Sequence, residues 1–131
     1  MKTLLALAGL LLMPTAKSAE SLDTGRMVAV LRALENGPSD NPWQFREPTW
    51  RAYSKVPLHT ASLAEHRRVA WLFTQACIRQ CHSLDLPISP EWVARLWNAG
   101  FGTVRDSRMT EAQRKFGDRA AALYHDKTFK Q

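Results

Sequence analysis

The sequence feature that most constrains the fold is a long regular pattern from Ser62 to Leu84. It opens with Ser62-Leu63-Ala64-Glu65, in which the serine hydroxyl and the glutamate carboxylate can each accept a hydrogen bond from a backbone N–H at a helix N-terminus. Apolar residues then recur at intervals of three and four, on one face of an α-helix: Val69, Leu72, Phe73, Ala76 and Cys77. The pattern predicts a helix that forms the spine of the core.

Four other segments show helical spacing between start and stop residues: 22–34, 48–55, 90–99 and 111–124. Asn36-Gly37-Pro38 ends the first, with Gly37 suited to a left-handed cap. Gly100-Phe101-Gly102 stops the third. No segment alternates apolar and polar residues over a useful length. The chain is therefore expected to be all-α, a single small domain of four to five helices.

The last predicted helix follows a second capping box, Thr110-Glu111-Ala112-Gln113. Gly117 lies inside this helix, where glycine costs about 1 kcal/mol relative to alanine. A close approach of another helix would explain the glycine. The polar tail after His125 is expected to fray.

The first nineteen residues have the pattern of a signal peptide. Lys2 is positive, residues 4–13 are apolar, and Ala16, Ser18 and Ala19 are small enough for cleavage. The apolar run is shorter than the roughly 20 residues that span a bilayer. We expect export to the periplasm or the extracellular space, and a folded domain over residues 20–131 without a membrane span.

Removal of residues 1–19 lowers the formal net charge from +6 to +4. This basic excess is modest, and its densest patch is His66-Arg67-Arg68. The patch is interpreted either as a solvated helix face or as an attraction to a polyanion. For an exported protein that polyanion would be the cell wall rather than a nucleic acid.

Glu35 lies at the end of the first predicted helix, before a loop rich in Asn, Pro, Ser and Asp. A helix C-terminus disfavours a negative charge, and burial by aromatic side chains would disfavour it further. Both effects predict a raised pKa, which suits a general acid. Glycosidic chemistry usually needs a second carboxylate, but Asp40 and Glu47 are better explained as turn or cap residues.

The aromatic residues near Glu35 fit either a core or a sugar-binding wall: Trp43, Phe45, Trp50 and Tyr53. Gln44 is polar between two aromatics, so it should face a cavity or have a buried partner. Sugar sites combine flat apolar faces with a few fixed amides. Asn98 precedes a glycine at a predicted helix end, so capping is its alternative role.

Four motifs occur in order along the chain: Ala-Leu-Glu-Asn-Gly at 33–37, Trp-Gln-Phe-(two)-Pro-Thr-Trp at 43–50, Leu-Trp-Asn-Ala-Gly at 96–100, and Gln-(two)-Phe-(three)-Ala-(three)-Tyr at 113–124. This series resembles the lysozyme-like superfamily, specifically the lytic transglycosylase domains related to goose-type lysozyme. The resemblance covers nearly all of residues 20–131. It implies a lysozyme-like fold.

The resemblance also implies cleavage of the β-1,4 bond between N-acetylmuramic acid and N-acetylglucosamine in peptidoglycan. Glu35 matches the single general acid/base, and the implied substrate-binding residues are Trp43, Gln44, Phe45, Trp50, Trp97, Asn98, Phe116 and Tyr124. Glu35 would protonate the glycosidic oxygen, then accept the proton of the attacking 6-hydroxyl, or of water in a lysozyme. No cofactor and no metal is implied, and the partner is the glycan strand, bound by a monomer.

The chain also departs from the family pattern. Asn41-Pro42-Trp43-Gln44 replaces the usual Gly-Leu-Met-Gln, Trp97 replaces a tyrosine, and Phe116 lacks a hydroxyl that family members often carry. The span from Glu35 to Gln44 is short. The alternative function is therefore a catalytically weak or inactive lysozyme-like module that binds cell-wall glycan or a protein partner.

Cys77 and Cys81 fall on one face of the long helix. They are interpreted as two reduced, buried thiols, although export permits a disulfide. Helix geometry fits such a bond poorly, since the Cβ directions diverge. A metal cluster with His82 would lack an evident third and fourth ligand.

Overall fold

The protein is described here by a computed structural model that covers residues 21–131. The predicted signal peptide, residues 1–19, lies outside the described residues. The helices are α2 (Thr24–Glu35), α3 (Glu47–Arg51), α4 (Leu63–Ser83), α5 (Pro90–Ala99), α6 (Phe101–Arg105) and α7 (Glu111–His125), with a 3₁₀ turn, η2 (Leu58–Thr60). No strand occurs in residues 21–131. The prediction of an all-helical chain is confirmed, with one more α-helix than expected.

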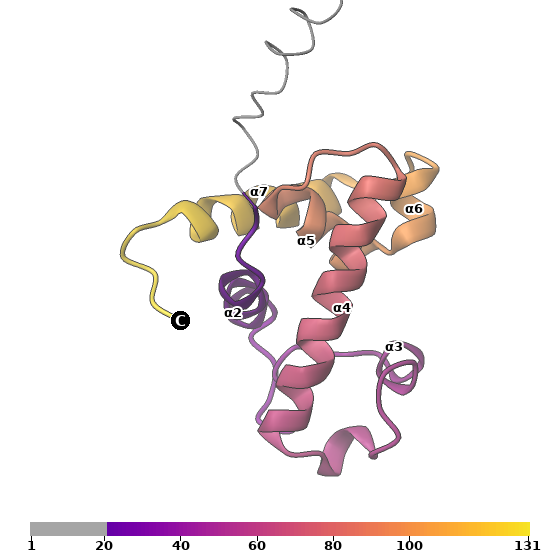
Figure 1. The fold of residues 1–131 in the computed structure, drawn as a ribbon, viewed down its shortest axis with the longest axis vertical. Helices are drawn as coiled ribbons and strands as arrows, with labels where there is room; N and C mark the ends of the chain where they lie inside the picture. The colour runs from indigo at the N-terminus through magenta and orange to yellow at the C-terminus, as the bar shows by residue number, and fades with distance from the viewer. Residues whose placement is uncertain (1–20) are drawn as a thin grey trace, which may run out of the picture.

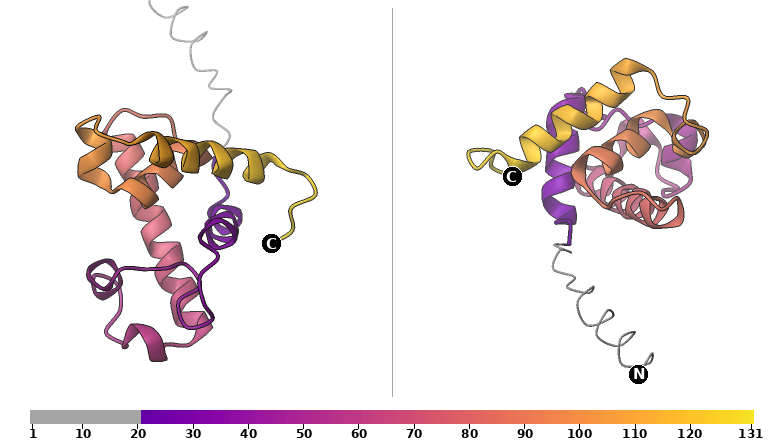
Figure 2. Two further views of the ribbon diagram at one scale, coloured as in Figure 1. Left: turned by 180° about the vertical axis from the view of Figure 1, so that it is seen from behind. Right: turned by 90° about the horizontal axis from the view of Figure 1, so that it is seen from above.

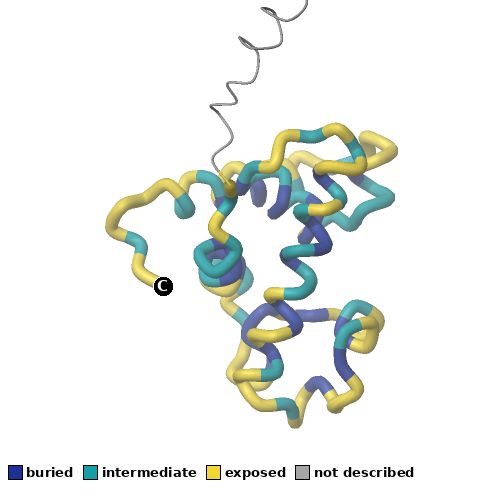
Figure 3. The backbone as a smooth tube through the Cα atoms, viewed as in Figure 1, coloured by how far each residue is buried: buried dark blue, intermediate teal, exposed yellow. Residues whose placement is uncertain are grey.

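The long helix α4 runs through the molecule and the other elements pack along it (Figure 1). Helices α5, α6 and α7 gather at its C-terminal end, while α3 and η2 lie near its N-terminal end. Helix α2 packs on both α4 and α7, and the further views in Figure 2 show α2 and α7 side by side. Buried positions concentrate where α2, α4 and α5 face one another (Figure 3). The spine role predicted for residues 62–84 is therefore confirmed.

The N-terminus of α4 is capped as predicted on one side only. The Ser62 hydroxyl accepts a hydrogen bond from the backbone N–H of Glu65 at 3.1 Å. The Glu65 carboxylate does not return to Ser62; it accepts from the hydroxyl of Ser54 at 2.6 Å and from the guanidinium of Arg68. The prediction that the Glu65 carboxylate accepts from the backbone N–H of Ser62 was wrong, because that carboxylate is already bonded to Ser54 and Arg68. Thr110 and Gln113 do form a complete capping box at the start of α7.

The end of α2 differs from the prediction: the residue with left-handed backbone is Asn36 and not Gly37. Asn36, with φ 47°, is the C-cap, and its N–H donates to the carbonyl of Arg32. Gly37 serves a different purpose, since a Cβ there would collide with the carbonyl oxygen of Asn41 and lie 2.7 Å from Cγ of Gln44. Gly37 is therefore required for the loop to close on itself.

Two other glycines shape the packing of α5. Gly100, with φ 93°, ends α5, but a new short helix, α6, begins at the next residue instead of a loop. This is the additional helix. A Cβ on Gly117 would lie 2.7 Å from Cγ of Arg95 and 2.7 Å from the carbonyl oxygen of Glu91. The predicted close helix contact at Gly117 is confirmed, and it joins α7 to α5.

The C-terminal tail is held in place, contrary to the prediction that it frays. The Arg26 guanidinium on α2 donates hydrogen bonds to the backbone carbonyls of Tyr124 at 2.7 Å, Asp126 at 2.7 Å and Phe129 at 3.2 Å. It also lies over the ring of Phe129, 5.3 Å from the centroid. The prediction failed because the partner of the tail lies about a hundred residues earlier, where no local pattern reveals it.

The basic patch at residues 66–68 does not act as one surface. His66 is buried, its ring lies 4.6 Å from that of Trp50, and burial lowers its pKa. Arg68 is paired with Glu65. Arg67 alone remains exposed without an ion pair among the described residues.

Both cysteines are free thiols buried in the core on α4. Burial raises the pKa of the Cys77 thiol and raises that of Cys81 to about 11. Thiols held in this form are packing residues rather than nucleophiles.

Candidate active site

A polar cleft of about 490 Å³ lies between the end of α2, the loop before α3 and the end of α5. Six of the residues predicted from the sequence line it: Glu35, Trp43, Gln44, Phe45, Trp97 and Asn98. They come from three segments separated by up to about sixty residues. The fold therefore brings the predicted acid, glutamine and asparagine to one place.

Glu35 is the last residue of α2 and is half-buried. Its Oε2 atom accepts a hydrogen bond from the indole N–H of Trp97 at 2.9 Å. Burial raises the pKa of the Glu35 carboxyl, and the Trp97 hydrogen bond opposes that shift without reversing it. The predicted direction of the pKa shift is confirmed, and burial is its main cause.

Aromatic packing holds the indole of Trp97 against Glu35. The Trp97 ring lies 5.5 Å from that of Phe45 and 4.9 Å from that of Phe73. Trp97 is buried, and so is Phe45. Packing on both neighbours fixes the indole, so the hydrogen bond to Glu35 is preorganised.

The loop after α2 is short, and several hydrogen bonds hold its backbone in place. The side chain of Asn41 accepts from the N–H of Phe45 at 2.9 Å and donates to its carbonyl at 3.1 Å. The N–H of Gly37 donates to the carbonyl of Pro42 at 3.0 Å. These bonds fold residues 37–45 into a rigid wall of the cleft.

Gln44 projects from this wall with a left-handed backbone, φ 53°, and is exposed in the cleft. Its side-chain amide donates to the backbone carbonyl of Glu35, which is one of the carbonyls that a helix end leaves free. Gln44 therefore ties the loop to the residue that carries the acid. Its amide oxygen stays available to a ligand.

Asn98 is exposed at the opposite wall. The alternative role of Asn98 was capping α5, but the cap is Gly100, whose N–H donates to the carbonyl of Leu96 at 3.1 Å. The Asn98 amide is therefore free for the cleft.

The structure does not bring Trp50, Phe116 or Tyr124 to this cleft. Trp50 is buried, and its indole N–H donates to the carbonyl of Val56 at 2.6 Å. Phe116 is buried on α7, and the hydroxyl of Tyr124 accepts from the N–H of Asp23 at 2.9 Å. Each is occupied by core packing or by a hydrogen bond elsewhere. Trp43 lines the cleft, but it is buried and its N–H donates to the carbonyl of Val28.

The two other candidate carboxylates also lie outside the cleft. Asp40 faces Nδ1 of His59 at 2.9 Å, and Glu47 faces Arg51 at 3.4 Å. Glu35 is the sole carboxylate among the described residues that line the cleft.

Sequence reasoning missed six residues of the cleft: Arg46, Thr49, Phe73, Ala99, Gly100 and Gln113. Ala99 and Gly100 directly follow Asn98. Arg46 and Thr49 follow Gln44 closely, so their proximity to a suspected site residue could have identified them. Gln113 could not be found in this way, because its capping-box role already accounts for it. Phe73 belongs to the apolar face of α4, and a residue in such a pattern is interpreted as part of the core.

In residues 21–131 no group of three or more His, Cys, Asp and Glu side chains is placed to hold a metal ion. None of the helices in this part of the chain combines the length and apolar character needed to cross a bilayer. Comparison of the chain with protein-family models, with curated proteins and with solved structures gave no match.

Proposed function

We propose that the protein is an exported peptidoglycan-cleaving enzyme with a lysozyme-like fold, in which Glu35 is the single general acid/base. One observation carries the proposal: a half-buried carboxyl of raised pKa lies in a polar cleft that it shares with Gln44 and Asn98. A raised pKa keeps a carboxyl protonated nearer to neutral pH, as donation to a leaving oxygen requires.

The proposed first step is donation of the Glu35 proton to the glycosidic oxygen, with cleavage of the bond from that oxygen to the anomeric carbon. Since the Trp97 indole occupies Oε2, Oε1 is the oxygen that carries the proton. The anomeric carbon is then attacked by the 6-hydroxyl of the same sugar, whose proton passes to the Glu35 carboxylate. The product is an anhydro sugar, and water as the nucleophile would give a reducing end.

This route suits a cleft in which Glu35 is the sole carboxylate among the described lining residues. Inverting and retaining hydrolases usually need a second carboxylate, to activate water or to form a covalent intermediate. Intramolecular attack by the 6-hydroxyl needs neither. The anhydro product is therefore the favoured outcome.

Glycan recognition is assigned to exposed polar side chains rather than to aromatic faces. Phe45 and Trp97 are buried, so they support the wall and offer little ring surface to a sugar. Gln44, Asn98 and Arg46 are exposed. Their amides and guanidinium can pair with hydroxyl, acetamido and carboxylate groups of a glycan strand.

Digestion of purified cell wall with wild type and with Glu35→Gln tests the proposal. We expect wild type to release soluble muropeptides with anhydro ends, identified by mass spectrometry. Glu35→Gln should lose at least about a hundredfold of this activity, the usual scale of general acid catalysis. Glu47→Gln, an exposed carboxylate outside the cleft, is the matched control and should stay active. Wild type without any release of muropeptides would rule out the enzyme.

A second candidate is a module of the same fold that binds glycan without cleaving it. The hydrogen bond from Trp97 favours the ionised form of Glu35, which is the form that cannot donate a proton. In this case wild type would sediment with insoluble peptidoglycan and release nothing. Alanine at Gln44 or Asn98 would abolish the binding, whereas alanine at exposed Arg51 would not.

A further inference from the structure

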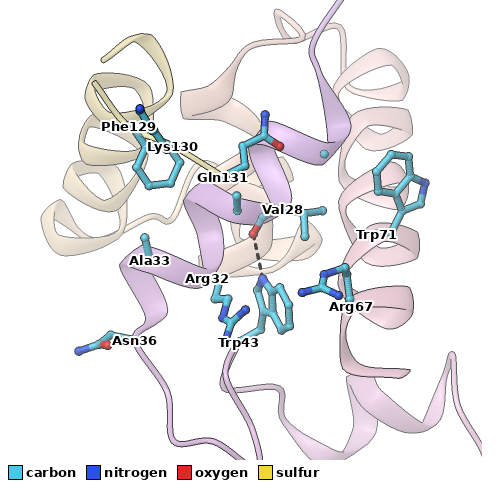
Figure 4. A pocket seen from close by; sticks show the side chains of 12 residues that line it. Val28, Arg32, Ala33, Asn36, Trp43, Arg67, Trp71, Phe129, Lys130 and Gln131 are labelled. Atoms are coloured by element: carbon cyan, nitrogen blue, oxygen red, sulfur yellow. Dashed lines mark hydrogen bonds between the residues drawn. The ribbon is translucent and has the colours of Figure 1, made fainter. Parts of the chain in front are cut away.

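A second cavity, of about 510 Å³, lies between α2, α4 and the C-terminal tail (Figure 4). It shares Trp43 with the cleft, but none of its other lining residues belongs to the cleft. It has no part in the function proposed above.

Its interior is apolar and flat-sided. Val28 and the ring of Trp43 lie at its base, and the Trp43 N–H is already bonded to the carbonyl of Val28 at 2.9 Å (Figure 4). Trp71 and Phe129 contribute further rings. Trp71 is 41% exposed, one of few large apolar side chains of the described chain left in solvent. A flat apolar ligand would cover the rings of Trp71 and Phe129, whereas Trp43 is buried beneath the cavity.

The charged side chains around this interior are all positive. Arg32, Arg67 and Lys130 line the cavity, and no Asp or Glu does so within the described residues. Arg32 and Arg67 flank Trp43 in Figure 4, and the Arg32 guanidinium lies 5.4 Å from the centroid of that ring. None of the three cations forms a salt bridge within residues 21–131. Gln131 also lines the cavity, and its α-carboxylate offsets one of these three positive charges. The remaining excess is positive, so the complementary group is an anion, and guanidinium groups favour a carboxylate in planar, bidentate geometry.

The wall made by the tail is fixed before any ligand arrives. Arg26 binds three carbonyls of residues 124–129, which positions Phe129 and Lys130 at the cavity. A preformed wall lowers the entropy cost of binding. The volume is within the range of small-molecule sites.

We propose that this cavity binds a small aromatic carboxylate, with its ring against Trp71 and Phe129 and its carboxylate between Arg32 and Arg67. The proposal is independent of the activity assigned to Glu35.

An NMR titration of the ¹⁵N-labelled protein tests the site, because each of the five tryptophans has one indole N–H resonance. The probes are N-acetylphenylalanine and its uncharged amide. We expect saturable shifts of the Trp43 and Trp71 resonances with the acid, and binding weaker by about tenfold or more with the amide. Three outcomes would overturn the proposal. They are equal binding of acid and amide, shifts confined to Trp97, and no saturable shift with the acid at about 10 mM, a concentration above which a Kd means negligible binding.

Two variants on the same helix separate the site from general charge. Arg67→Gln should weaken binding of the acid by about tenfold, while Arg79→Gln, exposed on α4 outside the cavity, should leave it unchanged. An equal loss of affinity for the acid in both variants would mean that net charge alone attracts the ligand, and it would reject the site. A short peptide ending in phenylalanine, with a free C-terminal carboxylate, completes the comparison. Tighter binding of this peptide than of the small acid would reassign the cavity to a chain end and reject the small ligand.

Discussion

Glu35 and Trp97 show how one residue pair sets the acidity of a carboxyl group in the cleft. Burial raises the pKa of Glu35, while the hydrogen bond from Trp97 restrains the rise. In the proposed reaction the same indole, bonded to Oε2, leaves Oε1 as the oxygen that carries the proton. A single tryptophan thus links the acidity of the carboxyl to its orientation.

Trp97→Phe removes this restraint and keeps most of the ring packing. We expect the pKa of Glu35 to rise further, so that the basic limb of the pH–activity profile moves to higher pH. An NMR titration of the Glu35 carboxyl measures the shift without an activity assay. Trp50→Phe is the control, because it removes an indole N–H that is bonded to Val56 instead. An unchanged or lower pKa of Glu35 in Trp97→Phe would contradict the role given to this hydrogen bond.

Glu35 also makes a prediction about stability. Because its pKa in the folded state is raised above the value of 4.5, the folded protein holds this proton to higher pH than the unfolded chain does. Stability therefore falls as pH rises through the two pKa values, when a half-buried carboxyl must ionise. Glu35→Gln avoids this cost. Urea denaturation should show the variant gaining free energy of unfolding relative to wild type as pH rises above 4.5, until Glu35 is ionised in the folded state as well. A difference that is independent of pH would contradict the raised pKa.

At the scale of elements, the loop between α2 and α3 owes its shape to close backbone approach. Gly37 leaves no room for a Cβ beside Asn41 and Gln44. The Asn41 side chain then fixes the backbone of Phe45. Few residues separate Glu35 from Gln44, but they are enough for a cleft wall. Hydrogen bonds tie this loop to Glu35 through Gln44 and to Phe45 through Asn41.

Gly37→Ala should disturb this loop. We expect a loss of about 1–3 kcal/mol in the free energy of unfolding, the usual scale of overpacking. Cleavage should fall as well, since Gln44 moves away from the carbonyl of Glu35. Gly102→Ala is the control, because a Cβ there meets only the flexible end of Arg105 at 3.6 Å. Equal stability of both variants in urea denaturation would show that the loop tolerates a side chain at residue 37.

At the scale of the whole molecule, Arg26 joins the two ends of the described chain. It binds the tail through three carbonyls, and Tyr124 accepts from the N–H of Asp23 nearby. Arg26→Gln should release residues 126–131 and cost about 1–2 kcal/mol, because hydrogen bonds from a partly exposed cation are lost. Hydrogen exchange should become faster in the tail alone. Arg114→Gln, exposed on α7, should leave exchange in the tail slow. Tail exchange at the wild-type rate in Arg26→Gln would mean that the tail is held by other contacts.

Local patterns predicted most of the helices and several of their caps. Ser62 and Thr110 cap as expected because an N-cap depends only on the next three residues. Half of the residues that line the cleft were also predicted, because Glu35, Gln44 and Asn98 lie in motifs whose order along the chain could be recognised. Tertiary partners account for the failures: Ser54 draws Glu65 away from its capping box, and Arg26 orders the tail. Trp50 resembled Trp43 in sequence, and only packing separates the two.

The ring of Trp43 is a partition between two chambers, the polar cleft on one side and the cationic cavity on the other. Consecutive turns of α2 supply the cation of one chamber, Arg32, and the acid of the other, Glu35. Because this ring is buried and its N–H is bonded to the carbonyl of Val28, it separates the two chambers as a common wall, and each chamber can fill independently of its neighbour.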